Sequence, residues 1–203
     1  MMIVIGITGG IASGKSTASS ILKKEYNAYV FDADKEAKLL LSNQEVSEKI
    51  IQSFPDLKSI DPKEISKIVF KNEDNQKKLN NIVHPVLRVE MMKRIDKVRN
   101  QKKHPIFIND AALIIESGSY EYYHDSGAYL ILLTTSESIR IKRALSRGNL
   151  SEKSIRERIR LQWDDEKKKD YADYTIENNG SVDDLRSAIR FLVKEIKENA
   201  KIS

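Results

Sequence analysis

The chain has 203 residues, of which 40% are hydrophobic, and it contains no cysteine, which excludes a disulfide framework and a thiolate metal site. Lysine and arginine exceed aspartate and glutamate by 35 − 30 = 5, and this excess suits an anionic partner, either a phosphorylated small molecule or a nucleic acid. No apolar run is long enough to span a membrane, and the first residues do not resemble a secretion signal, so we expect a cytoplasmic protein without membrane contacts.

The first predicted element is a buried strand over Ile3–Ile7, because this run is apolar and β-branched. The next residues, GGIASGKS at 9–16, match the pattern G-x-x-x-x-G-K-[ST] at every fixed position, and a helical pattern follows through Lys24. In this strand–loop–helix context, backbone N–H groups and the N-terminus of the helix bind phosphates. The pattern therefore predicts a nucleoside triphosphate site formed by Gly9, Gly10, Ala12, Ser13, Gly14, Lys15, Ser16 and Thr17.

Two side chains of this phosphate loop have distinct expected roles. Lys15 reaches the β- and γ-phosphates, and the hydroxyl of Ser16 ligates Mg²⁺. The alternative is a glycine turn that merely joins a strand to a helix, and the agreement of pattern with context disfavours it. The loop predicts that a triphosphate binds, but it does not indicate what is done with the phosphate.

The second predicted strand, Ala28–Phe31, is followed by two carboxylates, Asp32 and Asp34. Ligands of parallel sheets bind beyond the carboxyl ends of the strands. Asp32 is therefore the candidate that orients an acceptor hydroxyl and takes its proton, or that binds Mg²⁺ through water. Asp34 points elsewhere in an extended chain, toward the substrate or as a helix N-cap. The alternative that both carboxylates only cap the next helix stays open.

An all-helical region of about residues 35–100 separates the second strand from the third and predicts an inserted lobe. Asp61 and Pro62 are typical of an N-cap and a first helical position. His84-Pro85 is expected to interrupt a helix that resumes through Arg99, because proline lacks the N–H donor. A lone histidine favours a structural or exposed role over a functional one. The helical patterns cover residues 35–41, 46–54, 62–69 and 74–81, followed by the long helix.

The second half of the chain continues the alternation of strands and helices. We expect strands at 105–108, 129–133 and 173–176, and helices at 137–146, 151–162 and 182–198. The near-continuous apolar strands predict the α/β class, with a mostly parallel five-stranded sheet covered by helices on both faces. Asp110, at the end of the third strand, lies where a second metal-organising carboxylate is often found, although a structural cap is nearly as well supported.

Arg140, Arg143 and Arg147 share part of one helix face, and arginine suits bidentate phosphate contact. Arg143 and Arg147 lie shortly before Gly148-Asn149, which we interpret as a hinge for a lid at about 147–162. An exposed basic helix face is the alternative reading, and it is favoured for Arg140. The cluster Lys167–Lys169 is interpreted as a solvated helix face rather than as a nucleic-acid site.

Five segments together resemble the dephospho-CoA kinase family, and the similarity extends over essentially the whole chain. They are TGGIASGKST at 8–17, FDAD at 31–34, IVHP at 82–85, Arg140-x-x-Arg143 followed by Arg147, and ADYTIENNGS at 172–181. The resemblance implies a single P-loop kinase domain over 1–203, with a helical substrate lobe and a lid. It also implies transfer of the γ-phosphate of ATP to the ribose 3′-hydroxyl of dephospho-CoA, which is the last step of coenzyme A biosynthesis.

The resemblance also implies roles for individual residues. Asp32, Lys15 and Arg143 become the expected catalytic residues, Ser16 the Mg²⁺ ligand, and Arg143 and Arg147 contacts to phosphate or adenine. The family's D-x-P-L-L-F-E run reads DAALIIE at 110–116, with Ala112 in place of the proline, which bears on the stiffness of this loop. The expected substrate-binding residues are Asp34, His84, Pro85, Asp110, Leu113 and Glu116.

Three rival functions remain to be compared with this one. A nucleoside or nucleoside-monophosphate kinase would share the core, the insertion and the lid. A GTP-dependent switch is disfavoured because no N-K-x-D run follows a late strand and the arginines near the lid would be unexplained. A nucleic-acid-binding ATPase is favoured only by the basic balance. We expect ATP, Mg²⁺ and dephospho-CoA as partners, with no nucleic acid, and the sequence leaves the oligomeric state open.

Overall fold

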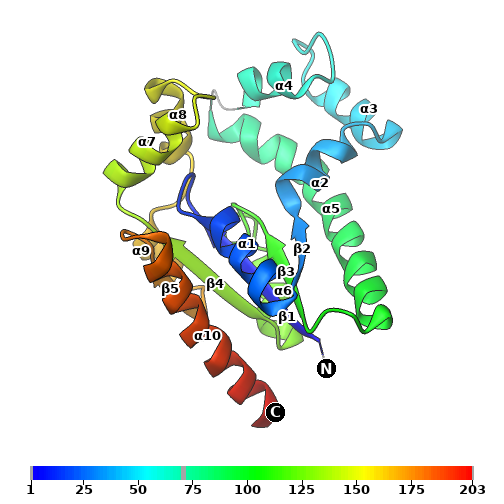
Figure 1. The fold of residues 1–203 in the computed structure, drawn as a ribbon. Coiled ribbons are helices and arrows are strands. Elements are labelled where there is room, and N and C mark those ends of the chain that lie inside the picture. The colour runs from blue at the N-terminus through cyan, green and yellow to red at the C-terminus, as the bar shows by residue number, and fades with distance from the viewer. Residues whose placement is uncertain (1, 70–71, 203) are drawn as a thin grey trace.

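The computed structural model describes residues 2–69 and 72–202, so that the two ends of the predicted domain and residues 70–71 of the predicted lobe lie outside it. Within these ranges the chain forms one five-stranded sheet in the order β2-β3-β1-β4-β5, and all four strand pairings are parallel (Figure 1). This confirms the predicted α/β sheet. The strands are β1 (Ile3–Gly9), β2 (Tyr29–Asp32), β3 (Ile106–Asp110), β4 (Tyr129–Thr134) and β5 (Tyr174–Glu177).

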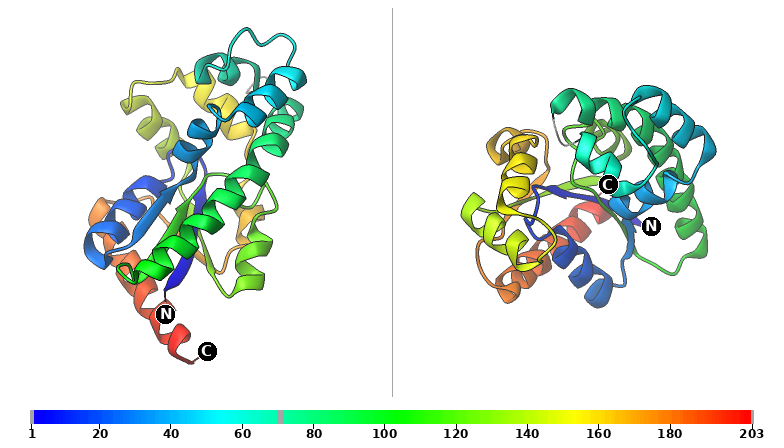
Figure 2. Two further views of the ribbon diagram at one scale, coloured as in Figure 1. Left: turned by 90° about the vertical axis from the view of Figure 1, so that its right-hand side faces the viewer. Right: turned by 90° about the horizontal axis from the view of Figure 1, so that it is seen from above.

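The sheet is buried because helices cover both of its faces (Figure 2). Helices α1 (Lys15–Tyr26) and α10 (Val182–Ile202) pack on one face, and α5 (Glu73–Gln101) and α6 (Tyr120–Ser126) pack on the other. Ile5 and Phe107 in the central strands are completely buried. Strands covered on both sides need apolar side chains in both directions, which is why they read as continuous hydrophobic runs in the sequence.

The helices between β2 and β3 form a separate lobe with its own hydrophobic core. We call these helices the helical lobe, and its core includes Val46, Ile50, Ile65 and Val83. The N-cap predicted at Asp61 is confirmed, since its carboxylate accepts a hydrogen bond of 2.8 Å from the backbone N–H of Lys63. The lobe consists of α2 (Ala33–Leu40), α3 (Gln44–Ser53), α4 (Pro62–Val69) and the N-terminal part of α5.

The predicted interruption at His84-Pro85 is wrong, because α5 continues through both residues. A proline inside a helix removes one backbone donor, and the cost can be met by packing elsewhere along the same helix. Val83 and Met91, on either side of the proline, are both buried, whereas Pro85 itself is exposed. Burial of one face on both sides of the proline therefore keeps the helix continuous.

Helices α7 (Glu137–Ser146), α8 (Glu152–Arg160) and α9 (Asp165–Lys169) follow β4. Helices α7 and α8 share a small apolar cluster with Ala12 of the phosphate loop, formed by Ile141, Ala144 and Ile155. The sequence reading missed α6 and α9, which are only seven and five residues long and offer no hydrophobic period. Within residues 2–69 and 72–202, no helix combines the length and apolar character that a membrane span requires.

Candidate active site

The phosphate loop runs between β1 and α1 and depends on glycine at two places. Gly9 has a φ of 144° and Gly14 a φ of 104°, which are angles that L-residues rarely adopt. A Cβ atom at Gly9 would also collide with the carbonyl oxygen of Leu133, and one at Gly14 with the side chain of Asn178. The backbone of the loop can therefore lie close to β4 and to the segment after β5 only with glycine at these positions.

Lys15 is the first residue of α1, and its ammonium group is folded back onto the loop. Its Nζ donates to the carbonyl oxygens of Gly9 at 2.8 Å and Gly10 at 3.2 Å. Burial lowers the pKa of Lys15, while the negative charges of Asp110 and Asp34 act in the opposite direction. The next residue, Ser16, is exposed, and its side chain stands at the N-terminus of the helix. The N-terminus of α1 thus carries the ammonium group of Lys15 and the exposed side chain of Ser16 beside the phosphate loop.

Two aspartates lie side by side at the carboxyl edge of the sheet. Asp32 at the end of β2 is the register partner of Asp110 at the end of β3. The carboxylate of Asp32 accepts a hydrogen bond of 2.9 Å from the backbone N–H of Lys35 and caps α2, while Ser19 donates to the carboxylate of Asp110 at 2.9 Å. Asp32 therefore fulfils the capping role that the sequence left open, and it still lines the cavity described below.

Two carboxylates at this edge, those of Asp110 and Asp34, have raised pKa values because of burial. Desolvation by the surrounding walls raises the pKa of Asp110 and of Asp34, which lies in the first turn of α2. The positive charge of Lys15 lowers the pKa of both groups, and desolvation outweighs it. The positive charge of Lys15 thus favours the charged form of both Asp34 and Asp110 against the effect of burial.

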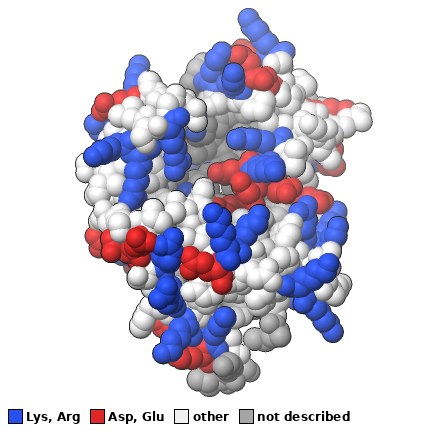
Figure 3. Space-filling model, viewed as in Figure 1, with Lys and Arg blue, Asp and Glu red and all other residues white. Residues whose placement is uncertain are grey.

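A cavity of about 870 Å³ joins the phosphate loop to the carboxylate edge and to the helical lobe. Figure 3 shows the molecule hollowed between the helical lobe and the side of α7 and α8, with acidic side chains beside the hollow and basic side chains around it. Residues 111–119, the loop between β3 and α6, form another part of the wall. Of the predicted site residues, those lining this cavity are Ala12, Lys15, Ser16, Asp32, Asp34, His84, Asp110, Leu113 and Arg147.

A second cavity of about 230 Å³ lies on the other side of the phosphate loop. Five predicted residues line it, namely Ala12, Gly14, Thr17, Arg143 and Arg147. Among the remaining loop residues, Ser13 is buried, and its carbonyl oxygen accepts a hydrogen bond of 2.8 Å from the side chain of Asn178. Gly9 and Gly10 do not line either cavity and instead hold Lys15 through their carbonyl groups.

The arginines of α7 differ in their surroundings. Arg143 donates to the carbonyl oxygens of Asn178 at 2.9 Å and Gly180 at 3.3 Å, which ties α7 to the segment after β5. The favoured reading of Arg140 as an exposed residue is wrong, because this side chain is only 7% exposed and donates to the carbonyl oxygen of Ile11 at 3.1 Å. Helix α7 packs against the tip of the phosphate loop, so this part of its basic face is buried.

His84 lies in the middle of α5 and lines the larger cavity from the side of the helical lobe. Burial lowers the pKa of His84, and the positive charge of Arg88 acts in the same direction. The imidazole is therefore neutral at neutral pH and is suited to hydrogen bonding rather than to charge pairing. Its neighbour Pro85 is exposed and is not part of the cavity wall.

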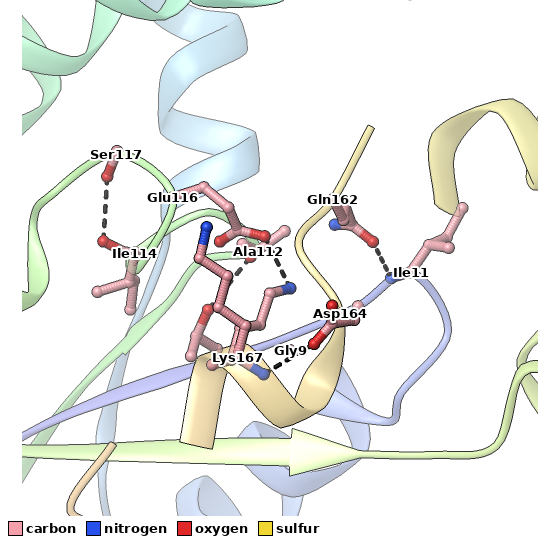
Figure 4. Close-up of polar contacts among 12 residues, drawn as sticks. Gly9, Ile11, Ala112, Ile114, Glu116, Ser117, Gln162, Asp164 and Lys167 are labelled. Carbon is pink, nitrogen blue, oxygen red and sulfur yellow. Dashed lines mark hydrogen bonds and ion pairs between the residues drawn. The ribbon is translucent and has the colours of Figure 1, made fainter. Parts of the chain in front are cut away.

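Sequence reasoning did not find two polar residues that line the cavity, Arg158 and Gln162. Arg158 of α8 donates to the hydroxyl of Ser66 in α4 at 3.1 Å and so connects α8 with the helical lobe. The carboxamide oxygen of Gln162 accepts from the backbone N–H of Ile11 at 2.9 Å (Figure 4). No motif in the sequence includes Gln162. For Arg158, the only signal in the sequence was the regular spacing of basic residues along α8.

The lysine cluster is not the uniformly solvated face that the sequence indicated. Lys168 is completely buried, and its ammonium group forms an ion pair of 2.7 Å with the carboxylate of Glu116. Lys167 instead lies 3.5 Å above the ring of Trp163, and Lys169 is exposed. Glu116, which the family resemblance suggested as a substrate residue, is therefore held by Lys168 and is not part of the cavity wall.

Within the described ranges, no group of three or more histidine, cysteine, aspartate or glutamate side chains is arranged to hold a metal ion. A divalent cation at the phosphate loop would therefore take part of its ligands from a bound phosphate, as Mg²⁺ commonly does. The exposed hydroxyl of Ser16 and the carboxylates of Asp32 and Asp110 are oxygen groups that line the same cavity. This donor set fits Mg²⁺, which prefers oxygen ligands.

Similarity to known proteins extends over most of the chain. The family model for dephospho-CoA kinase matches residues 3–184. A dephospho-CoA kinase of Oceanobacillus iheyensis is 37% identical over 193 residues, which cover 92% of this chain and 94% of that protein.

Solved structures are similar over nearly the full length. A dephospho-CoA kinase from Campylobacter jejuni has a TM-score of 0.66 at 28% identity, covering 98% of this chain and 100% of that one. A shikimate kinase from Acinetobacter baumannii in complex with shikimate has a TM-score of 0.61 at 16% identity, covering 98% and 95%, and it shows the fold alone. The family match, the sequence identity and the P-loop kinase fold agree, and the chain belongs to the dephospho-CoA kinase family.

Proposed function

We propose that this protein transfers the γ-phosphate of ATP to the ribose 3′-hydroxyl of dephospho-CoA, giving coenzyme A and ADP. The observation that carries the proposal is the single 870 Å³ cavity, which reaches from Lys15 and Ser16 past Asp32 to His84 in the helical lobe. A phosphoryl transfer enzyme has to hold donor and acceptor in one space, with little covalent chemistry of its own. The match to the dephospho-CoA kinase family supplies the identity of the acceptor.

The donor side is the phosphate loop with the smaller cavity beside it. The triphosphate lies along residues 9–17, where backbone N–H groups and the N-terminus of α1 stabilise negative charge. Lys15 contacts the β- and γ-phosphates once its ammonium leaves the carbonyl groups of Gly9 and Gly10. The 230 Å³ cavity, lined by Arg143, Arg147 and Asn178, takes the adenine end of ATP.

The Mg²⁺ ion that we expect with ATP would be held by the hydroxyl of Ser16 and by phosphate oxygens. Asp32 and Asp110 line the same cavity and can bind its water ligands. When bound, the ion neutralises part of the charge on the phosphates during transfer. The Ser19 hydroxyl keeps the carboxylate of Asp110 oriented for this task.

The acceptor side comprises residues of about 35–100 and the 111–119 loop. Asp32 stands at the end of β2 between the donor loop and the helical lobe, where its carboxylate can orient the 3′-hydroxyl and take its proton. Asp34, His84, Asp110 and Leu113 line the cavity on this acceptor side, whereas Pro85 and Glu116 do not line it.

Residues of about 147–162 act as a lid over the two substrates. Arg147 lines both cavities, and Arg158 reaches from α8 to Ser66 on the other side of the larger cavity. Positive charge from two positions of this segment can therefore surround the transferred phosphate. We place the reaction in the cytoplasm, with two small-molecule substrates and no nucleic acid partner.

An acceptor panel tests the proposal. The protein is incubated with Mg·ATP and, in separate reactions, with dephospho-CoA, adenosine, AMP, a pyrimidine nucleoside and shikimate, and ADP release is measured. Among these acceptors, we expect only dephospho-CoA to give rapid ADP release. Preferred phosphorylation of a nucleoside or of AMP would reject the proposal in favour of the rival kinase, and a preference for GTP as donor would reject ATP as the co-substrate.

A further inference from the structure

The ion pair between Glu116 and Lys168 is the most deeply buried pair of opposite charges described in the chain. The side chain of Lys168 is 0% exposed and that of Glu116 is 10% exposed, with 2.7 Å between Nζ and Oε1. Glu116 lies in the 111–119 loop, and Lys168 lies in α9. Among the described residues, neither charged group has a further hydrogen bond, so each of them depends on the other.

Such a pair is a poor source of stability. Removing two charges from water costs several kcal/mol for each ion, roughly as much as their attraction returns, and an apolar pair of similar volume is often as stable. Neither residue lines either of the two cavities, so neither is placed to contact a substrate. The presence of this ion pair is better explained by the two segments that it connects, the 111–119 loop and α9.

The ion pair ties the C-terminal part of the 111–119 loop, which carries Glu116, to α9. The other end of this loop is tied to β1, because the N–H of Ala111 donates to the carbonyl of Ile7 at 3.1 Å and Thr8 donates to the carbonyl of Ala112 at 3.2 Å. The loop contains no proline to restrict its backbone, and the backbone N–H groups of Ser117 and Gly118 donate to the carbonyl oxygens of Leu113 and Ile115 within the loop. Six of its residues line the cavity, namely Ala111, Ala112, Leu113, Ile114, Ser117 and Ser119.

The segment that carries Lys168 is itself connected to the phosphate loop. The segment before Lys168 begins at Gln162, which accepts a hydrogen bond from Ile11, and Asp164 caps α9 through the N–H of Lys167 at 2.7 Å (Figure 4). Through residues 162–168, the ion pair thus connects the 111–119 loop with the tip of the phosphate loop. A shift at the pair would change the distance between these two walls of the cavity.

We propose that Glu116 and Lys168 are positioning residues that set the 111–119 loop against the phosphate loop, so that the acceptor is held in line with the donor phosphate. This rests on the proposed function. Glu116 then acts through Lys168 and does not contact dephospho-CoA. Because the 111–119 loop forms part of the cavity wall, a shift of this loop would weaken the binding of dephospho-CoA although the ion pair itself does not touch the substrate.

The test separates positioning from stability. Glu116→Leu combined with Lys168→Met replaces the ion pair by an apolar pair, and we expect its Tm to lie within about 3 °C of the wild type. We expect its KM for dephospho-CoA to rise about tenfold and its KM for ATP to change less than about twofold, because the donor loop keeps its own contacts. A normal KM for dephospho-CoA together with a normal Tm would overturn the proposal.

Two further variants complete the experiment. Glu116→Asp keeps both charges but shortens the side chain by one methylene, so we expect it to raise the KM for dephospho-CoA. This variant still tests the proposal if the protein with the apolar pair does not fold. An unchanged KM for dephospho-CoA in Glu116→Asp also overturns the proposal. The control is Glu166→Leu with Lys169→Met, which removes an exposed ion pair of 2.6 Å from the same helix and should leave both KM values unchanged. If the wild type itself forms no coenzyme A, the proposed function fails instead.

Discussion

Asp32 and Asp110 are register partners at the ends of two neighbouring strands, but their carboxylates are held in different ways. Asp32 accepts a backbone N–H at the start of α2, and Asp110 accepts the hydroxyl of Ser19 in α1. The first carboxylate is thus fixed to the helical lobe and the second to the helix of the phosphate loop. A movement of the lobe would displace Asp32 relative to Asp110, and with it the group that we propose as the base.

Asp32→Asn should lower turnover about 10²-fold or more, as expected for the loss of a general base, while ATP still binds. Asparagine is about as good an N-cap as aspartate, so α2 should remain intact. Steady-state kinetics, ATP titration and Tm measure the three effects separately. Turnover close to that of the wild type would remove Asp32 from the mechanism.

Lys15→Ala should weaken ATP binding and slow turnover together, because Lys15 is the side-chain cation that we place at the β- and γ-phosphates. Lys23→Ala is the matched control, since Lys23 lies on the same helix and is exposed. Titration with ATP and a kinase assay compare the two variants. Equal behaviour of both would show that the loop lysine has no special role.

Asp110→Asn should stabilise the fold at neutral pH although it lies at the active site. Desolvation raises the pKa of Asp110 in the folded state, so its neutral form is preferred there, and this contribution to stability is lost as the pH rises through the folded pKa. Asparagine stays neutral and can still accept the hydrogen bond of Ser19. The free energy of unfolding should therefore be higher in the variant at pH 7.

Urea unfolding at several pH values checks this sign. The advantage of Asp110→Asn should shrink as the pH falls and vanish below the ordinary pKa of aspartate, where the wild-type carboxyl is protonated in both states. A variant that is less stable than the wild type at pH 7, with the difference growing toward acid pH, would show that Asp110 is stabilised as an anion.

Arg143→Ala should raise the KM for ATP by about tenfold, because hydrogen bonds to charged groups contribute about 1.5–3 kcal/mol. The KM for dephospho-CoA should change little, since Arg143 lines the smaller cavity and not the larger one. Arg143→Lys restores the charge without the planar donor pair and should recover only part of the affinity. An effect confined to the KM for dephospho-CoA would show that Arg143 acts on the acceptor and not on ATP.

The sheet and the phosphate loop could be predicted because their signals are local. A strand that is buried on both faces appears in the sequence as a continuous apolar run. The phosphate-loop pattern needs only eight consecutive residues, 9–16. These features required no knowledge of distant contacts. The pairing of Asp32 with Asp110 was not predicted, because it depends on the order of the strands in the sheet, which no local pattern gives.

The errors concern residues whose environment is made by distant parts of the chain. Lys168 reads as a surface residue within a basic run, but it is buried because Glu116, 52 positions earlier, supplies a counter-charge. Arg140 is buried because the carbonyl of Ile11 packs against α7. Pro85 does not break α5, because the helix buries residues on both sides of it. Local propensity cannot anticipate such contacts, and the fold overrides it.

The central claim is that the γ-phosphate of ATP is transferred to the 3′-hydroxyl of dephospho-CoA. Incubation with Mg·ATP labelled in its γ-phosphate, followed by mass spectrometry and phosphorus NMR of the product, tests it most directly. We predict one labelled phosphate on the ribose 3′-oxygen of dephospho-CoA, formed in equal amount with ADP. Release of labelled inorganic phosphate with dephospho-CoA unchanged, or a label at another position of the acceptor, would contradict the account.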